Sequence, residues 1–143
     1  MAPSPLPYNR VMRQFAALLM LAVPLALPAE APPPLTCPAT WTPPGTTPPG
    51  PARNFERINI YNGKPGRQEY DLAPDDETQT GRKIKQTWFL NDYRSMDIFV
   101  RCRYRGTDAV KTLAVPAKYQ KCTFTFEMDK QNNITGKPSF SCE

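Results

Sequence analysis

The 143-residue sequence contains no histidine. This absence excludes a Ser-His-Asp triad, a Cys-His nucleophile pair and every zinc or haem site that depends on a histidine ligand. Long hydrophobic runs are also missing, because the longest, Phe15–Leu27, has 13 residues, whereas a membrane-spanning helix needs about 20. No window of the sequence has a clear 3.6-residue period, so helices are not expected to build the fold. The chain has room for one domain at most.

The N-terminal segment has the order of a secretory signal peptide. Arg10 and Arg13 form a basic region ahead of the apolar run, and small residues follow it. We therefore predict a signal peptide over residues 1–31, no transmembrane segment after its removal, and a periplasmic or secreted mature protein. The mature chain then carries 16 basic and 12 acidic residues, a net charge of +4.

Two positions compete as the cleavage site. Ala29-Glu30-Ala31 fits the A-x-A pattern, but Pro32 is a poor residue for signal peptidase to cut before, so a cut after Ala29 is the alternative. The start of translation is open in the same way. Initiation at Met12 instead of Met1 would give a cleaner signal, without the proline-rich N-terminal stretch.

Proline is unevenly distributed along the chain. Fourteen of the 18 prolines lie at or before Pro51. The segment 38–51 can therefore form neither a helix nor a central strand, because proline lacks the amide hydrogen that both require. We expect residues 32–52 to be an extended, partly polyproline-II leader that packs Trp41 on the following domain.

From residue 53 onward, apolar and polar residues alternate as they do in half-buried strands. The alternation marks seven segments: Ile58–Ile60, Tyr70–Leu72, Ile84–Leu90, Ile98–Tyr104, Val110–Val115, Cys122–Met128 and Phe140–Cys142. Asn62-Gly63 is a hairpin-type turn signal, and a short helix or turn is expected near Lys118. The predicted fold class is all-β, a small antiparallel sandwich or open barrel of about seven strands built from residues 53–143.

The four cysteines are expected to form two disulfides, because an exported chain of this length reaches an oxidising compartment. A hairpin centred on Asn132 places Cys122 opposite Cys142 and Phe124 opposite Phe140, with all four side chains on the same side. A core of about 90 residues is marginal by itself, so two bridges of about 2–4 kcal/mol each would matter to its stability.

Four cysteines allow three connectivities. In a simple meander, Cys102 and Cys122 lie on either side of the strand Val110–Val115, farther apart than the roughly 7 Å that a bridge spans. This geometry favours Cys122–Cys142 together with Cys37–Cys102, which attaches the leader to the sheet. The alternative, Cys102–Cys122 with Cys37–Cys142, requires a curled sheet or a different strand order.

Short motifs follow one another along the mature chain: Cys37-Pro38, Gly63-Lys64-Pro65, Leu72-Ala73-Pro74, Trp88, Cys102-Arg103-Tyr104-Arg105-Gly106-Thr107, Pro116, Cys122 and Cys142. This order resembles a family of small exported proteins from Gram-negative bacteria, most of them without an assigned activity. The most specific part is C-x-Y-x-x-T followed by a short strand, a proline and a cysteine. The chain departs from the family at Val115-Pro116, where Leu-Pro is usual, and in its Pro/Gly-rich linker between Trp41 and Arg53.

The resemblance implies a periplasmic or secreted disulfide protein with no established activity. It also implies a distant likeness in architecture to the small β-barrel inhibitors of c-type lysozyme. The loop motif of those inhibitors is absent from this chain, so the likeness concerns the fold and carries little weight for function.

Asp75, Asp76 and Glu77 form a cluster of carboxylates between turn signals. Paired carboxylates serve glycoside hydrolysis or calcium binding. This cluster lacks the alternating ligand spacing and the glycine of a calcium loop, and consecutive acidic residues in a loop are usually just solvated. We predict that the chain is not an enzyme and that it holds no metal and no cofactor.

Three arginines are spaced two residues apart: Arg101, Arg103 and Arg105. While their strand continues, they share its outward face with Phe99. Guanidinium groups in a row can hold carboxylates or phosphates in bidentate fashion, and Lys111 and Lys121 are further candidates on adjacent strands. The simpler interpretation is that these arginines solvate an open sheet face or keep an edge strand from aggregating.

These observations predict a non-catalytic binding module. An envelope glycan, a lipid phosphate or an acidic protein surface would suit the arginines, and nucleic acid is not an expected partner outside the cytoplasm. Inhibition of a c-type lysozyme through a surface loop near residues 73–80 is the alternative. Such lysozymes are usually basic, so a partner of net charge +4 would approach without attractive steering. A structural role in the envelope is the third interpretation.

Overall fold

The structure, a computed structural model, describes residues 31–45, 48–93 and 95–143. Apart from Ala31, the predicted signal peptide lies outside the described residues, and its cleavage site and the limits of the leader stay predictions. None of the helical segments in the described ranges has the length and apolar character that a membrane span requires. The described residues form two antiparallel five-stranded sheets, which confirms the all-β prediction and selects the sandwich.

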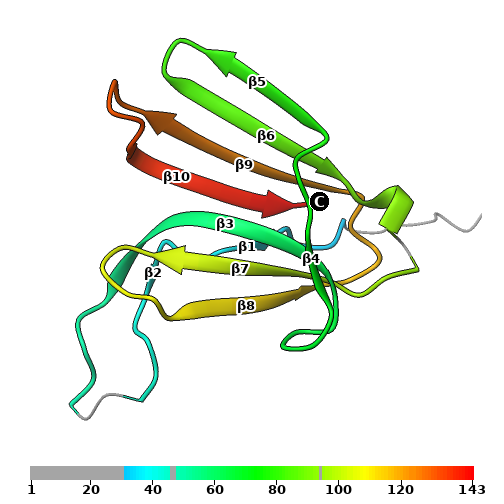
Figure 1. Cartoon of the computed structure of the whole chain (residues 1–143), viewed down its shortest axis with the longest axis horizontal. Coiled ribbons are helices and arrows are strands. Elements are labelled where there is room, and N and C mark those ends of the chain that lie inside the picture. The colour runs from blue at the N-terminus through cyan, green and yellow to red at the C-terminus, as the bar shows by residue number, and fades with distance from the viewer. Residues whose placement is uncertain (1–30, 46–47, 94) are drawn as a thin grey trace, which may run out of the picture. The chain divides into compact units, whose positions relative to one another are not determined.

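The two sheets are named A and B. Sheet A contains, in spatial order, β1 (Leu35–Thr36), β10 (Ile134–Cys142), β9 (Lys121–Met128), β6 (Lys83–Phe89) and β5 (Asp76–Thr80). Sheet B contains β2 (Thr40–Trp41), β3 (Arg53–Gly63), β7 (Ile98–Tyr104) and β8 (Val110–Val115), and β4 (Glu69–Asp71) pairs with the C-terminal end of β3. A short 3₁₀ helix, η1 (Leu90–Tyr93), follows β6. Figure 1 shows β5, β6, β9 and β10 in the upper layer and β3, β7 and β8 below them.

The core lies between the inner faces of the two sheets. Alternate residues of β7 and β9 point inward, and Cys102, Cys122 and Phe124 are almost fully buried. Phe55 of sheet B meets Phe124 of sheet A edge to face, with ring centroids 6.1 Å apart, and it also contacts Tyr104 at 6.0 Å. Such aromatic pairs contribute beyond the area they bury, so they hold the layers together.

The β9–β10 hairpin has the predicted register at its disulfide end, while a β-bulge between Thr135 and Ser139 shifts the pairing nearer the turn, where Ile134 lies opposite Met128. Cys142 pairs with Cys122 and Phe140 pairs with Phe124. Asn132 lies in the turn with a positive φ of 61°, a conformation that asparagine tolerates better than most residues. The expected turn near Lys118 is also present, at the start of the segment that leads into β9.

The disulfides join Cys37 to Cys102 and Cys122 to Cys142, the pairs that the strand geometry favoured. The simple meander behind that argument is wrong, however, because β8 ends sheet B and β9 lies in sheet A. Cys102 and Cys122 are therefore in different layers instead of on either side of one strand. Cys37 lies where the chain passes from β1 to β2, so its bridge to β7 fixes the leader at the crossing between the sheets.

The residues that the structure describes form ten strands, three more than the alternation predicted. Two of them, β1 and β2, belong to the proline-rich leader, where each has two residues at a sheet edge. These short edge strands agree with the rule that proline excludes central strands, but the leader is more closely tied to the domain than a free tether. Trp41 packs on Tyr104 at 5.2 Å between ring centroids, as expected. The third, β5, lies where a loop was predicted, and its residues are all polar and exposed in the structure.

Candidate functional site

The outward face of sheet B carries the charged residues on which the sequence analysis centred. Val100, Cys102 and Tyr104 of β7 point into the core, so the residues between them point away from it. The pairing of β3 with β7 places Arg101 opposite Asn59, and it places Tyr61 opposite Phe99 on the same face. These residues, together with Arg103 of β7 and with Glu69 and Asp71 of β4, are called the arginine face.

Arg101 is committed to partners within the protein. Its Nη2 lies 2.6 Å from Glu69 Oε1, and its guanidinium lies over the rings of Tyr61 and Phe99 at 4.8 and 5.5 Å from their centroids. The two rings are themselves stacked at 5.3 Å. Phe99 points outward as predicted but is only 3% exposed, because this stack covers it. Arg101 is therefore a packed side chain with a carboxylate already in place.

Arg103 has fewer partners within the protein than Arg101 has. Its Nε donates a 2.8 Å hydrogen bond to Asn59 Oδ1, and Asn59 Nδ2 donates in turn to Asp71 Oδ2 at 3.4 Å. Within the described part of the chain, the Arg103 guanidinium forms no ion pair. Arg57 lies opposite it on β3 with a side chain that is 61% exposed. Arg57 Nε also lies 3.9 Å from Glu56 Oε2, in an exposed ion pair of the kind that contributes little to stability. Arg103 of the arginine face, and beside it the largely exposed Arg57, thus remain accessible to a partner.

Arg105 does not join this face. β7 ends at Tyr104, and Arg105 turns toward the other sheet, where its Nη2 donates to the Ile134 carbonyl oxygen at 2.8 Å. The lysines that were considered with it lie elsewhere. Lys111 is in register with the inward-facing Cys102, and Lys121 of sheet A pairs with Glu143 at 2.5 Å. Two of the three arginines are brought together, and the third is separated from them because the strand stops.

Glu69 is a residue that the sequence analysis missed. Its Oε1 accepts a hydrogen bond from the Gly66 backbone N–H as well as from Arg101. These two donors, the Gly66 N–H foremost, hold the pKa of the Glu69 carboxyl below its ordinary value. The carboxylate therefore connects the β3–β4 turn to the arginine face. No sequence pattern marks this role, because Arg101 and Glu69 are 32 residues apart.

The β3–β4 turn depends on a glycine at its start. Gly63 has a φ of 103°, and a Cβ at this position would lie 1.9 Å from the Gln68 carbonyl oxygen. The Gly63 N–H donates to the Asp97 carbonyl oxygen at 2.9 Å, and the Lys64 N–H donates to the Gln68 carbonyl oxygen at 3.2 Å. Gly63 thus allows the turn to fold back closely and to meet the segment ahead of β7.

A hollow of about 570 Å³ lies beside this turn. Tyr70 of β4 and Met96 of the η1–β7 segment line it, with side chains that are 63% and 49% exposed. Two cations of the turn, Lys64 and Arg67, lie at its border. The hollow was not predicted from the sequence, because Tyr70 was assigned only to an alternating strand and Met96 was assigned to no element.

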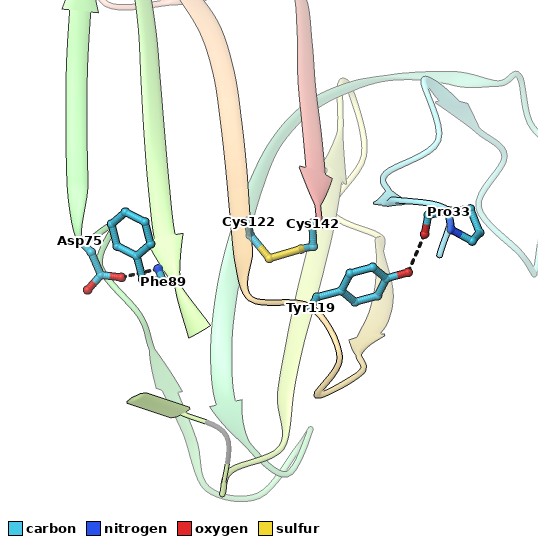
Figure 2. The surroundings of a disulfide bond; sticks show 6 residues. All are labelled: Pro33, Asp75, Phe89, Tyr119, Cys122 and Cys142. Carbon is cyan, nitrogen blue, oxygen red and sulfur yellow. Dashed lines mark hydrogen bonds between the residues drawn. A yellow bond between two sulfur atoms is a disulfide. The ribbon is translucent and has the colours of Figure 1, made fainter. Parts of the chain in front are cut away.

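Two of the three carboxylates of the predicted cluster, Asp75 and Glu77, accept hydrogen bonds from elsewhere in the fold. Asp75 accepts a 2.7 Å hydrogen bond from the Phe89 backbone N–H, so its side chain holds two segments together (Figure 2). Asp76 and Glu77 belong to β5, and Glu77 accepts a 2.7 Å hydrogen bond from Gln86. Among the described residues, no group of three potential metal-ligating side chains is close enough to hold an ion.

The surroundings of the Cys122–Cys142 bridge serve the fold. Tyr119 is buried, and its hydroxyl donates a 2.8 Å hydrogen bond to the Pro33 carbonyl oxygen of the leader, as Figure 2 shows. Trp88 is buried as well, and its ring N–H donates to the Leu72 carbonyl oxygen at 2.9 Å. These contacts attach the leader and the β4–β5 segment to the two sheets.

Comparison with known proteins assigns the chain. The family model of the Type VI secretion system Tli immunity protein matches residues 48–143. An uncharacterized 16.3 kDa protein from the trpG 5′ region of Azospirillum brasilense is 28% identical in an alignment that covers 90% of this chain and 95% of that protein. No solved structure matches. Because the family match covers more than half of the chain, the chain is a non-catalytic member of the Type VI secretion system Tli immunity protein family.

Proposed function

We propose that the mature chain acts in the periplasm as an immunity protein that binds a type VI lipase effector and blocks it. The observation that carries this proposal is the family match over residues 48–143, which covers nearly the whole disulfide-bonded sandwich. A binding role also agrees with the absence of histidine from the sequence and with the structural hydrogen bonds that Asp75 and Glu77 accept. The chain would then inhibit by occupying the surface of the enzyme.

The two disulfides support the proposed periplasmic location. Two bridges that join Cys37 to Cys102 and Cys122 to Cys142 persist in an oxidising environment such as the periplasm. A lipase effector delivered to the envelope of a target cell would act in that same compartment. The predicted signal peptide over residues 1–31 would take the immunity protein there.

The proposal is tested by measuring whether the chain protects growing cells from the effector. The test uses bacteria that export to their own periplasm a type VI lipase effector from the species that encodes this chain. These cells produce the chain in one of two forms, either with its signal peptide or as residues 32–143 without it. We expect the exported form to restore growth and the cytoplasmic form to leave the cells sensitive. Growth inhibition that the exported chain does not relieve, at normal periplasmic levels of the oxidised protein, would contradict the proposal.

Inhibition of lysozyme stays an alternative prediction, and the same purified protein can distinguish it from the immunity function. A turbidity assay with c-type, g-type and i-type lysozymes measures it directly. The immunity function predicts that lysis proceeds at the same rate with and without the chain at micromolar concentration. Inhibition of a lysozyme with no effect on a lipase effector would favour the alternative.

Binding of an anionic envelope component is a second candidate function. The observation that favours it is the adjacent pair Arg57 and Arg103, of which Arg103 forms no ion pair within the described ranges. The test is retention on vesicles that contain phosphatidylglycerol, compared between the native chain and Arg57→Glu/Arg103→Glu. Equal retention of both proteins would remove this candidate. Arg101 is left unchanged in the variant because it holds Glu69.

A further inference from the structure

We propose that the hollow between Tyr70 and Met96 is the place where the effector docks, and that the docking segment of the effector combines an apolar side chain with carboxylates. This inference rests on the proposed function, because it names the surface that such an immunity protein would use. The hollow lies at the end of sheet B, where β3 turns into β4 and the η1–β7 segment passes beside it.

The first argument is the exposure of large apolar side chains. Among the described residues, only Tyr70, Met96 and Phe89 are large, hydrophobic and exposed, at 63%, 49% and 48%. Two of the three line the same hollow. Tyrosine and methionine are enriched in protein–protein interfaces, where an aromatic anchor in a pocket often carries much of the binding energy. Neither side chain belongs to the buried core of the sandwich.

The second argument is charge. In the described part of the chain, neither Lys64 nor Arg67 has a side-chain hydrogen bond or an ion pair. Asp97 is the one acidic residue in the lining, so the border of the hollow has a net positive charge. A partner that places carboxylates there gains both attraction on approach and hydrogen bonds with the two cations.

The third argument is preorganisation. The turn that carries Lys64 and Arg67 is closed by a hydrogen bond from the Arg67 N–H to the Lys64 carbonyl oxygen at 3.1 Å. Glu69 holds the Gly66 N–H of the same turn, and Arg101 holds Glu69. A surface that is already fixed loses less conformational entropy when it binds. Arg101 is therefore a positioning residue for the docking surface.

Met96 gives the surface an adaptable part. Its sulfur accepts a hydrogen bond from Asn62 Nδ2 at 3.1 Å, while Asn62 Oδ1 is buried and has no partner among the described residues. A bound segment that shifts the flexible Met96 side chain can donate to this oxygen. A second hollow of about 500 Å³ shares Met96 and Asp97 in its lining and includes Tyr93 and Pro116, so the contact can extend from one hollow into the other.

The test measures the affinity of the purified, oxidised mature chain for the purified lipase effector of the same species. We expect Tyr70→Ala and Lys64→Glu/Arg67→Glu each to weaken binding by about tenfold or more. Tyr70→Phe, which keeps the ring, should stay within about twofold of the native affinity. The loss caused by the charge reversal should shrink as the salt concentration rises.

Two matched controls alter similar side chains elsewhere. Phe89→Ala removes an equally exposed apolar group, and Lys83→Glu/Lys130→Glu reverses two exposed cations, none of which lines the hollow. All control variants should bind within about twofold of the native chain. If the native chain binds and the hollow variants bind equally well, the docking surface is wrong and the proposed function stands. If the native chain itself neither binds nor inhibits the effector, the proposed function is wrong, and the docking surface fails with it.

Discussion

Removal of the Cys37–Cys102 bridge is the perturbation whose magnitude follows most directly from the structure. The bridge closes a loop of 65 residues, against 20 for Cys122–Cys142. The loop-entropy relation gives about 4 kcal/mol of stabilisation for the longer loop and about 3 kcal/mol for the shorter. The longer bridge also holds the crossing between β1 and β2, so its loss frees the leader strands and the packing of Trp41.

The measurement is urea unfolding of oxidised Cys37→Ala/Cys102→Ala and Cys122→Ala/Cys142→Ala beside the native chain. Domains of this size have about 5–15 kcal/mol of stability, so either loss is a large fraction of the total. With a denaturant slope of about 1–3 kcal/mol per molar urea, a loss of about 4 kcal/mol lowers the midpoint by more than about 1 M. Tryptophan fluorescence follows the transition, because Trp88 is buried and Trp41 packs on Tyr104.

The reasoning is refuted if the Cys37–Cys102 variant loses less than about 1 kcal/mol, or if it is clearly more stable than the Cys122–Cys142 variant. Either result would mean that the leader is held by its strand pairing alone. The far-ultraviolet spectrum of both variants should stay that of a β protein, so that a global loss of structure is not mistaken for a change in stability.

Two further predictions concern the β3–β4 turn. Gly63→Ala should lower the free energy of unfolding by about 2 kcal/mol or more, because its Cβ would clash with the Gln68 carbonyl at a φ of 103°. Gly81→Ala, at a φ of 62° with open space around it, should cost only about 1 kcal/mol in the same urea titration. The second prediction is pH dependence: the Gly66 N–H of the turn, and after it Arg101, lower the folded-state pKa of Glu69 below its ordinary value. Its stabilising contribution is therefore complete above the pKa of the unfolded chain and is lost as the pH falls through the lower folded value. Glu69→Gln should show a smaller loss of urea midpoint between about pH 6 and pH 2 than the native chain, and equal slopes would contradict the assigned role.

The parts of the fold that the sequence predicts are those with local periodicity. The alternation of Cys122 to Met128 and the turn near Asn132 predict a hairpin in which Cys122 lies opposite Cys142, and the structure has this pairing. The bulge between Thr135 and Ser139, which shifts the register nearer the turn, was not predicted. The outward position of Arg101 and Arg103 follows from the same period of two. Pairing across long distances is not contained in such patterns, so the meander was wrong and the two-layer order of the strands came from the structure alone.

Only part of the candidate site could be predicted from the sequence, for the same reason. Arg105 continues the spacing of the stripe, but the strand ends one residue earlier and its guanidinium binds Ile134 of the other sheet. Glu69 meets Arg101 because β4 pairs with β3, and no short sequence motif predicts that pairing. β5 was missed because an exposed edge strand of polar residues such as Asp76 to Thr80 has no apolar face to alternate.

Neutralisation of a lipase effector by this chain is measured by titrating the purified effector with the oxidised mature protein while ester hydrolysis is followed. We expect hydrolysis to fall in proportion to the added chain and to stop near equal amounts of the two proteins, with the complex eluting as one peak in gel filtration. Full hydrolysis in the presence of excess oxidised chain, with the two proteins eluting separately, would contradict the proposed function.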